Sequence, residues 1–161
     1  MDERQKAFIE SEKKGREKWE QYFGDYYKNI QFTDLYDNYD VITYTPRGNN
    51  RINWEIKNRD IPHEKYEDKG FMLEKTKYDA LINADGIGFY CNFFADDYIA
   101  IWNVRNIDTR GRWKKRWCTS TTAGDSYREE VKLKDCIDLF PSEAVKYVKL
   151  PATQNNKSEI Y

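Results

Sequence analysis

The chain has few of the residues that build zinc sites or disulfide frameworks. Its 161 residues include one histidine and three cysteines. Cys91, Cys118 and Cys136 lie far apart and form no Cys-x-x-Cys pair. A structural zinc ion needs four closely spaced nitrogen or sulfur ligands, so we expect no zinc site. An odd number of scattered cysteines, without a visible secretion signal, is typical of reduced thiols and indicates a cytoplasmic location.

Long apolar stretches and a surplus of one charge are absent as well. No run approaches the roughly 20 apolar residues of a membrane-spanning helix, and the charged N-terminus does not resemble a signal peptide. We therefore expect no membrane partner. The net charge is −1, so any surface for nucleic acid must come from a local cluster of charge. A chain of this length is expected to fold as a single domain with a substantial core.

Two alternating segments form the most informative stretch of the chain. Residues 39–44 (YDVITY) and 52–59 (INWEIKNR) are rich in β-branched and aromatic residues. The Gly48-Asn49 dipeptide between them is a signal for a two-residue type II′ turn. We therefore predict two antiparallel strands joined by a tight turn.

Within this hairpin, Asp40, Glu55 and Lys57 fall on one face, because successive strand residues point to opposite sides. A turn at Gly48-Asn49 places Asp40 opposite Lys57, whereas a turn at Arg47-Gly48 places Asp40 opposite Glu55. Directly opposed Cβ atoms lie about 5 Å apart and diagonal ones about 7 Å, within reach of one shared divalent cation. The predicted core face is the other one, which carries Val41, Thr43, Ile52, Trp54 and Ile56.

Two carboxylates beside a lysine suit the hydrolysis of a phosphodiester. Hard oxygen ligands bind Mg²⁺, which polarises a phosphoryl oxygen and lowers the pKa of a bound water. The lysine can orient that water or offset charge on the phosphate. Glu-x-Lys also occurs on exposed strand faces as a cross-strand ion pair, and spacing alone does not separate the two interpretations. Asp37 is a rival acid, although a turn aspartate usually bonds its own backbone.

The order of Asp40, a hairpin and then Glu55-Ile56-Lys57 resembles the PD-(D/E)XK nuclease superfamily, most closely its Holliday-junction-resolvase-like and phage-type members. The resemblance covers roughly residues 14–92, and the literal Pro-Asp pair is absent because Tyr39 precedes Asp40. It implies a restriction-endonuclease-like core with the order α-β-β-β-α-β. It also implies that Asp40, Glu55 and the backbone carbonyl of Ile56 bind Mg²⁺ or Mn²⁺, while Lys57 positions or activates the attacking water.

Members of this superfamily often carry a glycine and then a glutamate in the first helix, and this glutamate reaches the metal. Here Gly15 interrupts the helix expected over residues 3–28, so Glu17 or Glu20 is a candidate for that role. The alternative is that both are surface glutamates.

The remaining segments complete an expected α/β fold with a central mixed sheet flanked by helices. We predict strands over 29–35, within 86–104 on both sides of Asp96-Asp97, near 118 and over 130–136, and helices over 71–84 and 142–150. The single domain, residues 1–161, then divides into a core over about 14–92, a basic hairpin and C-terminal β/α extension over about 93–150, and a loose tail over 151–161.

A local cluster of positive charge lies at residues 105–117. It holds six cationic side chains and one carboxylate, interleaved with tryptophans. Cations bind phosphates and rings stack on bases, so we predict a projecting hairpin or loop that contacts nucleic acid on the same side as the acids. The predicted contact residues are Arg105, Arg110, Arg112, Trp113, Lys114, Lys115 and Arg116. Lys75 and Lys77 are further candidates for phosphate contacts, against the alternative of an exposed helix face.

Together these features predict a metal-dependent nuclease that hydrolyses phosphodiester bonds, with DNA as the expected substrate and a phage or mobile element as the expected setting. The alternatives are a non-catalytic nucleic-acid-binding or host-interaction protein on the same scaffold, and a plain structural domain. The sequence leaves open the choice between DNA and RNA, the preferred substrate shape and whether the chain forms a homodimer.

Overall fold

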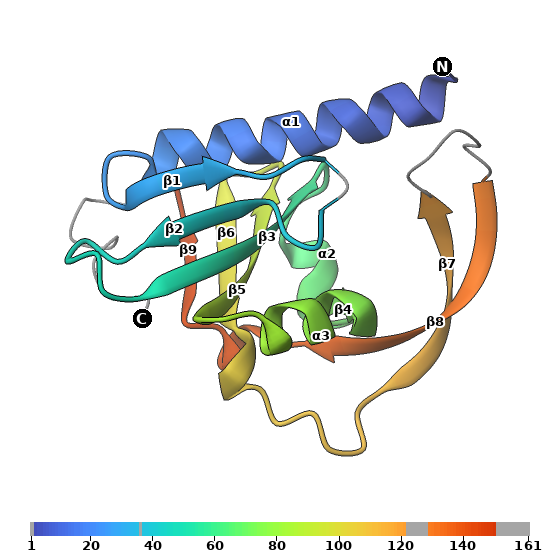
Figure 1. The fold of residues 1–161 in the computed structure, drawn as a ribbon. Helices are drawn as coiled ribbons and strands as arrows, with labels where there is room; N and C mark the ends of the chain where they lie inside the picture. The colour runs from blue at the N-terminus through green and yellow to red at the C-terminus, as the bar shows by residue number, and fades with distance from the viewer. Residues whose placement is uncertain (1, 36, 122–128, 151–161) are drawn as a thin grey trace.

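A six-stranded mixed sheet forms the centre of the molecule (Figure 1). The computed structural model describes residues 2–35, 37–121 and 129–150, so the predicted tail lies outside the described residues. The strand order is β1-β2-β3-β5-β6-β9, and β3 and β5 are the parallel pair. The strands are β1 (Lys28–Phe32), β2 (Val41–Tyr44), β3 (Arg51–Arg59), β5 (Ile87–Phe94), β6 (Tyr98–Asn103) and β9 (Lys146–Lys149).

The long first helix, α1 (Glu3–Phe23), covers one face of this sheet (Figure 1). The Asp2 carboxylate accepts the backbone N–H of Gln5 at 2.8 Å and caps the helix start. The Trp19 ring packs on Trp54, with ring centroids 5.4 Å apart. Gly15 lets the helix approach β3, because a Cβ there would come within 3.0 Å of a side-chain carbon of Ile56.

The predicted core face of the hairpin is confirmed. Its five residues are all buried, and four of them pack with α1 in one hydrophobic cluster. These four are Val41, Ile52, Trp54 and Ile56. The fifth, Thr43, accepts a hydrogen bond from the Trp54 indole N–H at 2.9 Å.

The opposite face of the sheet is covered as well. A second sheet with the strand order β4-β8-β7 packs there together with α3 (Lys75–Asn83). Its strands are β4 (Phe71–Glu74), β7 (Lys114–Thr121) and β8 (Glu129–Leu139). Buried side chains from this sheet, among them Phe71 and Leu139, join Tyr90 and Trp102 of the main sheet in a second hydrophobic cluster. The main sheet is therefore covered on both faces, as an α/β fold requires.

The expected core order is confirmed, because α1, β1, β2, β3, α3 and β5 follow one another as α-β-β-β-α-β. Two short elements are inserted between β3 and α3, namely α2 (Glu64–Glu67) and β4. Two 3₁₀ turns, Val104–Asn106 and Pro141–Glu143, follow β6 and β8.

The hairpin turn differs from the predicted two-residue turn at Gly48-Asn49. A four-residue loop joins the strands, and the Thr45 N–H donates to the Asn50 carbonyl at 3.0 Å. Gly48 has a φ of +75°, which glycine adopts without strain. Val41 pairs with Trp54, so the register is that of a turn centred on Arg47-Gly48.

Two predicted helices were partly or wholly wrong. Residues 71–74 form strand β4, because Phe71 and Leu73 alternate into the core while pairing with β8. Only residues 75–83 of that segment are helical. The helix predicted over 142–150 is instead a 3₁₀ turn followed by β9, which pairs with β6 at the sheet edge.

Candidate active site

Asp40 lies where β2 separates from β3. Its backbone N–H donates to the Trp54 carbonyl at 2.7 Å. Its Oδ2 accepts the backbone N–H of Ile56 at 2.7 Å, so the carboxylate replaces the strand neighbour that β2 no longer provides. Its Oδ1 accepts from Arg16 of α1 at 3.2 Å. Asp40 is 5% exposed, and these two donors give its buried carboxyl oxygens hydrogen-bond partners.

Glu55 is the second buried acid, and it is 2% exposed. Continuing the register of Val41 with Trp54 places it beside Asp40. Lys77 Nζ of α3 lies 3.3 Å from Glu55 Oε1, and Lys57 Nζ lies 3.8 Å from the same oxygen. The pKa of Glu55 is raised to about 7, mainly by burial and also by the charge of Asp40, while the charges of the two lysines oppose the shift.

The glutamate that the first helix brings to this site is Glu12, rather than Glu17 or Glu20. Its side chain hydrogen-bonds to Asp40, and burial raises its pKa to about 7 against the opposing charge of Lys57. Glu17 and Glu20 are exposed on α1. The spacing of residues 12, 15, 16 and 19 puts Glu12 on the helix face that packs on the sheet, and this periodicity is the signal that could have identified it.

Three carboxylates and two lysines therefore meet where α1, β2, β3 and α3 converge. Burial, and then the charges of the neighbouring acids, raise the pKa values of Glu12 and Glu55 more than the lysines lower them. Such a set of hard oxygen donors fits a divalent cation. In the described part of the chain, however, no group of three or more His, Cys, Asp or Glu side chains already has the arrangement of a cation site. A cation would have to displace the proton from Glu12 and turn carboxylate oxygens away from Arg16 or Lys77.

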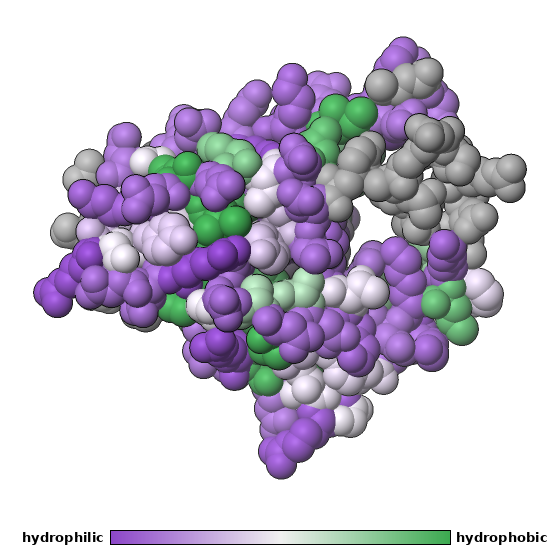
Figure 2. Space-filling model, viewed as in Figure 1, coloured by the Kyte–Doolittle hydropathy of each residue, from purple (hydrophilic) through white to green (hydrophobic). Residues whose placement is uncertain are grey.

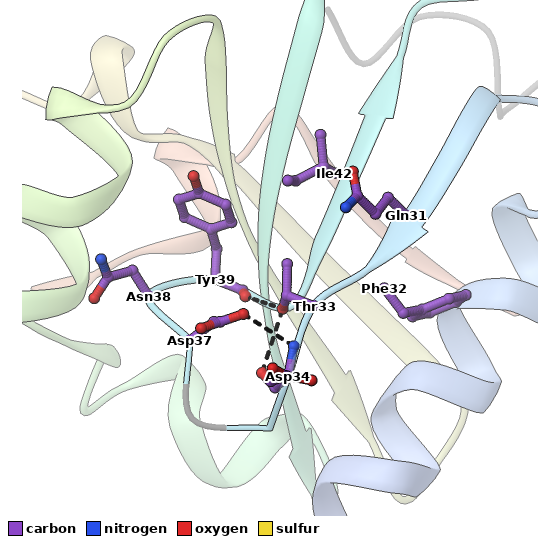
Figure 3. A pocket seen from close by; sticks show the side chains of 8 residues that line it. All are labelled: Gln31, Phe32, Thr33, Asp34, Asp37, Asn38, Tyr39 and Ile42. Carbon is purple, nitrogen blue, oxygen red and sulfur yellow. Dashed lines mark hydrogen bonds between the residues drawn. The ribbon is translucent and has the colours of Figure 1, made fainter.

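A surface pocket of about 420 Å³ is formed by the end of β1 and by the loop that leads to Asp40 (Figure 3). Its lining residues are Gln31, Phe32, Thr33, Asp34, Asp37, Asn38, Tyr39 and Ile42. Asp37, the rival acid, accepts the backbone N–H of Asp34 at 2.9 Å within this loop (Figure 3). It therefore has the local role expected of a turn aspartate.

The basic segment, residues 105–117, forms a loop that enters β7 rather than the tip of a hairpin. Most of its positive charge is already paired with carboxylates. The pairs are Arg110 with Asp108 at 2.7 Å, Arg112 with Glu143, Lys115 with Asp135 at 2.9 Å and Arg116 with Asp138 at 2.5 Å. Arg105 and Lys114 are exposed and have no carboxylate partner within the described residues. The charge available for phosphate contacts is thus smaller than the sequence indicated.

The two tryptophans of this segment differ in their surroundings. Trp113 packs edge-on against Tyr78, with centroids 5.2 Å apart, and Lys75 lies 5.6 Å from its ring centroid. Trp117 is 72% exposed on β7, directly opposite Leu133 of β8. Trp117 is therefore better placed than Trp113 to stack on a base.

Strands β7 and β8 project from the body of the molecule beside the N-terminal half of α1 (Figure 1). In the same view, hydrophilic side chains cover most of the surface that the described residues form (Figure 2). Because β8 also pairs with β4, which leads directly into α3, this projection is anchored next to the helix that supplies Lys77. Residues 122–128, which connect β7 and β8 in the chain, lie outside the described residues.

No helix in the described residues is both long and apolar enough to cross a membrane. No family model matches the chain, and the comparison with curated proteins finds no match. Among solved structures, the chain is similar to Hjc, a Holliday junction resolvase from the archaeal hyperthermophile Archaeoglobus fulgidus. The similarity covers 84% of this chain and 87% of that one, at 9% sequence identity and a TM-score of 0.47.

Proposed function

We propose that this protein is a divalent-metal-dependent nuclease that hydrolyses phosphodiester bonds of nucleic acid, with DNA as the expected substrate. The observation that carries the proposal is the pair of buried acids Asp40 and Glu55, with the half-buried Glu12 and with Lys57 beside them. The alternative interpretation, an ion pair on an exposed strand face, does not fit Glu55, because this residue is only 2% exposed. Several acids whose pKa values are raised by burial and by one another are typical of functional sites.

In this proposal Asp40 and Glu55, with the Ile56 carbonyl, hold a divalent ion. When bound, such an ion supplies a Lewis acid that stabilises charge on the phosphate. The glutamate that α1 contributes to the proposed metal site is Glu12, and not Glu17 or Glu20, because Glu12 is the helix acid that lies against Asp40.

Lys57 orients the attacking water. Its pKa is raised, because the charges of Glu55 and Glu12 outweigh the opposing effect of burial, so the ammonium stays protonated at neutral pH. A charged lysine donates hydrogen bonds and offsets negative charge on the phosphate, but it does not take a proton.

A melting experiment tests the metal site. An ion that binds only the folded chain raises the free energy of unfolding by about 2.7 kcal/mol at 100 times its dissociation constant. We expect Mn²⁺ and Mg²⁺ to raise the melting temperature of the native chain, and Glu55→Gln to lose most of this response. Glu17→Gln, an exposed acid on the same helix as Glu12, is the matched control and should keep the full response. If the metal raises the melting temperature of Glu55→Gln as much as that of the native chain, Glu55 is not a metal ligand.

A second candidate is a non-catalytic nucleic-acid-binding or host-interaction protein on the same scaffold. It is favoured by the ion pairs of Arg16 with Asp40 and of Lys77 with Glu55, which satisfy both acids without a metal. This second candidate would be favoured if the native chain binds nucleic acid, shows no metal-dependent melting shift and cuts no substrate.

The wider setting belongs to the same proposal. We expect a cytoplasmic protein of a phage or mobile element, and a homodimer remains open. All three cysteines are buried free thiols, which agrees with a reducing compartment.

A further inference from the structure

A cation without a carboxylate partner lies on the same face of β3 as the candidate active site. Arg59 follows Glu55 and Lys57 at the alternating positions of the strand. Its Nε donates to Asn92 Oδ1 at 2.8 Å, and its Nη2 donates to the Tyr90 hydroxyl at 3.1 Å. Nη2 also donates to the Met72 carbonyl at 3.3 Å, and the guanidinium carbon lies 5.0 Å from the Tyr66 ring centroid. All of these partners are neutral, and within the described residues no carboxylate pairs with Arg59. The guanidinium is thus held in a fixed position while its charge is not neutralised.

The side chain that holds Arg59 has an unused donor. Asn92 is 0% exposed, and its Nδ2 has no hydrogen-bond partner within the described residues. Leaving a buried N–H without an acceptor costs about 1–3 kcal/mol, so such a group calls for an explanation. Asn92 pairs with Lys57 in the parallel ladder of β3 and β5, so its amide lies between Lys57 and Arg59.

An arginine–asparagine pair at the other end of β3 shows what a complete version of this arrangement looks like. Arg51 Nε donates to Asn53 Oδ1 at 2.9 Å, and Arg51 Nη2 donates to the Tyr39 hydroxyl at 3.0 Å. There the second amide donor is satisfied, because Asn53 Nδ2 donates to the Asp85 carbonyl at 2.7 Å. An asparagine that holds an arginine on this strand can therefore satisfy both of its polar groups, so the unpaired donor of Asn92 is not a general result of strand geometry.

We infer that Arg59 and Asn92 form a subsite for a phosphodiester group, next to the phosphate held at Lys57. An unneutralised guanidinium beside an unused N–H donor is complementary to an anion with several acceptor oxygens, and arginine matches phosphate well. Arg59 lies two positions after Lys57 on β3, and its guanidinium bonds Asn92, the ladder partner of Lys57, so the two cations lie on one face near each other. The identity of the ligand as nucleic acid rests on the proposed function.

The test is a measurement of nucleic-acid binding in EDTA, which removes divalent metal, so that binding is measured without cleavage. Fluorescence anisotropy of a labelled oligonucleotide duplex is measured over a range of salt concentrations for the native chain, Arg59→Gln and Asn92→Asp. Asn92→Asp keeps the acceptor for Arg59 but replaces the free N–H with a negative oxygen. It should leave the melting temperature close to native, yet weaken binding at least about tenfold, or about 1.4 kcal/mol. Arg59→Gln should weaken binding by a similar factor and lower the salt slope by about 0.9, the value of one duplex phosphate contact.

Arg51→Gln is the matched control and should bind like the native chain. Unchanged affinity and salt slope in Arg59→Gln and Asn92→Asp would overturn the subsite, as would an equal loss in Arg51→Gln or no binding by the native chain. A melting shift with inorganic phosphate, without oligonucleotide binding, would overturn its assignment to a nucleic-acid strand. Absence of cleavage by the native chain would count against the proposed nuclease function and not against this subsite.

Discussion

The buried acid Glu55 should make the metal-free protein less stable as the pH rises toward neutral. Its pKa of about 7 in the folded chain lies above the ordinary value of 4.5. Between these values the folded chain keeps a proton that the unfolded chain has released, so the free energy of unfolding falls with increasing pH. The contribution is fully present below about pH 4.5 and is lost by about pH 7. A shift of this size corresponds to on the order of 3 kcal/mol.

Urea unfolding in EDTA at pH 5.0 and pH 7.5 measures this effect. Native chain should lose stability between the two values, and Glu55→Gln should lose less, by on the order of 3 kcal/mol, because its amide does not titrate. Glu17→Gln controls for removal of one charge from the exposed surface and should follow the native chain. If native chain and Glu55→Gln change in parallel with pH, Glu55 is not the strained acid that the structure indicates.

The remaining predictions concern the basic segment and one turn. The triple variant K114A/K115A/R116A should lower the salt slope of nucleic-acid binding by less than the value of three phosphate contacts, because Lys115 and Arg116 already pair with carboxylates. A decrease equal to three contacts would show that these ion pairs open when nucleic acid binds. Gly86→Ala should destabilise the fold by about 1–3 kcal/mol or more in urea unfolding, since φ is +93° and the new Cβ would lie 2.2 Å from a backbone carbonyl oxygen. Gly48→Ala, with φ of +75° and nothing within 4 Å of its Cβ, should cost less, and equal losses would contradict the steric argument.

The hairpin was predictable because both of its signals are local. Alternation along residues 52–59 separated the core side of Trp54 from the side of Glu55 and Lys57, and the structure has the same division. The register was left with two solutions because Gly48 is compatible with more than one turn. Pairing of Val41 with Trp54 settles it in favour of the register that sets Asp40 beside Glu55.

Other features depend on contacts between distant segments, which alternation and periodicity do not report. Phe71 and Leu73 fit a helical pattern, but their pairing with β8, more than 60 residues later, makes this segment a strand. Likewise, Arg112 looked free in the sequence, and its partner Glu143 follows only after β7 and β8. His63, the one histidine of the chain, is buried and bonded to Asp96 at 2.5 Å, a partner 33 residues away that no local pattern indicates.

The site itself was predicted in part. Asp40, Glu55 and Lys57 were named from spacing, and the fold brings Glu55 into contact with Lys57. Glu12 was not among the predicted site residues. It lies in a stretch of α1 rich in charged residues, which usually faces solvent, but the helix crosses β3 at Gly15 and brings Glu12 against Asp40.

The most direct test of the nuclease proposal is cleavage of linear DNA, branched DNA and RNA by the native chain and Lys57→Ala, with Mg²⁺ or Mn²⁺ and with EDTA. The native chain should cut at least one of these substrates only when metal is present. Lys57→Ala should keep the metal-dependent melting shift but lose cleavage, because the acids remain while the water loses its partner. Lys114→Ala, which removes an exposed lysine from β7, is the control and should still cut. Cleavage by Lys57→Ala at the native rate would contradict the role given to this lysine, and a native chain that binds nucleic acid but cuts nothing with either metal would contradict the proposal as a whole.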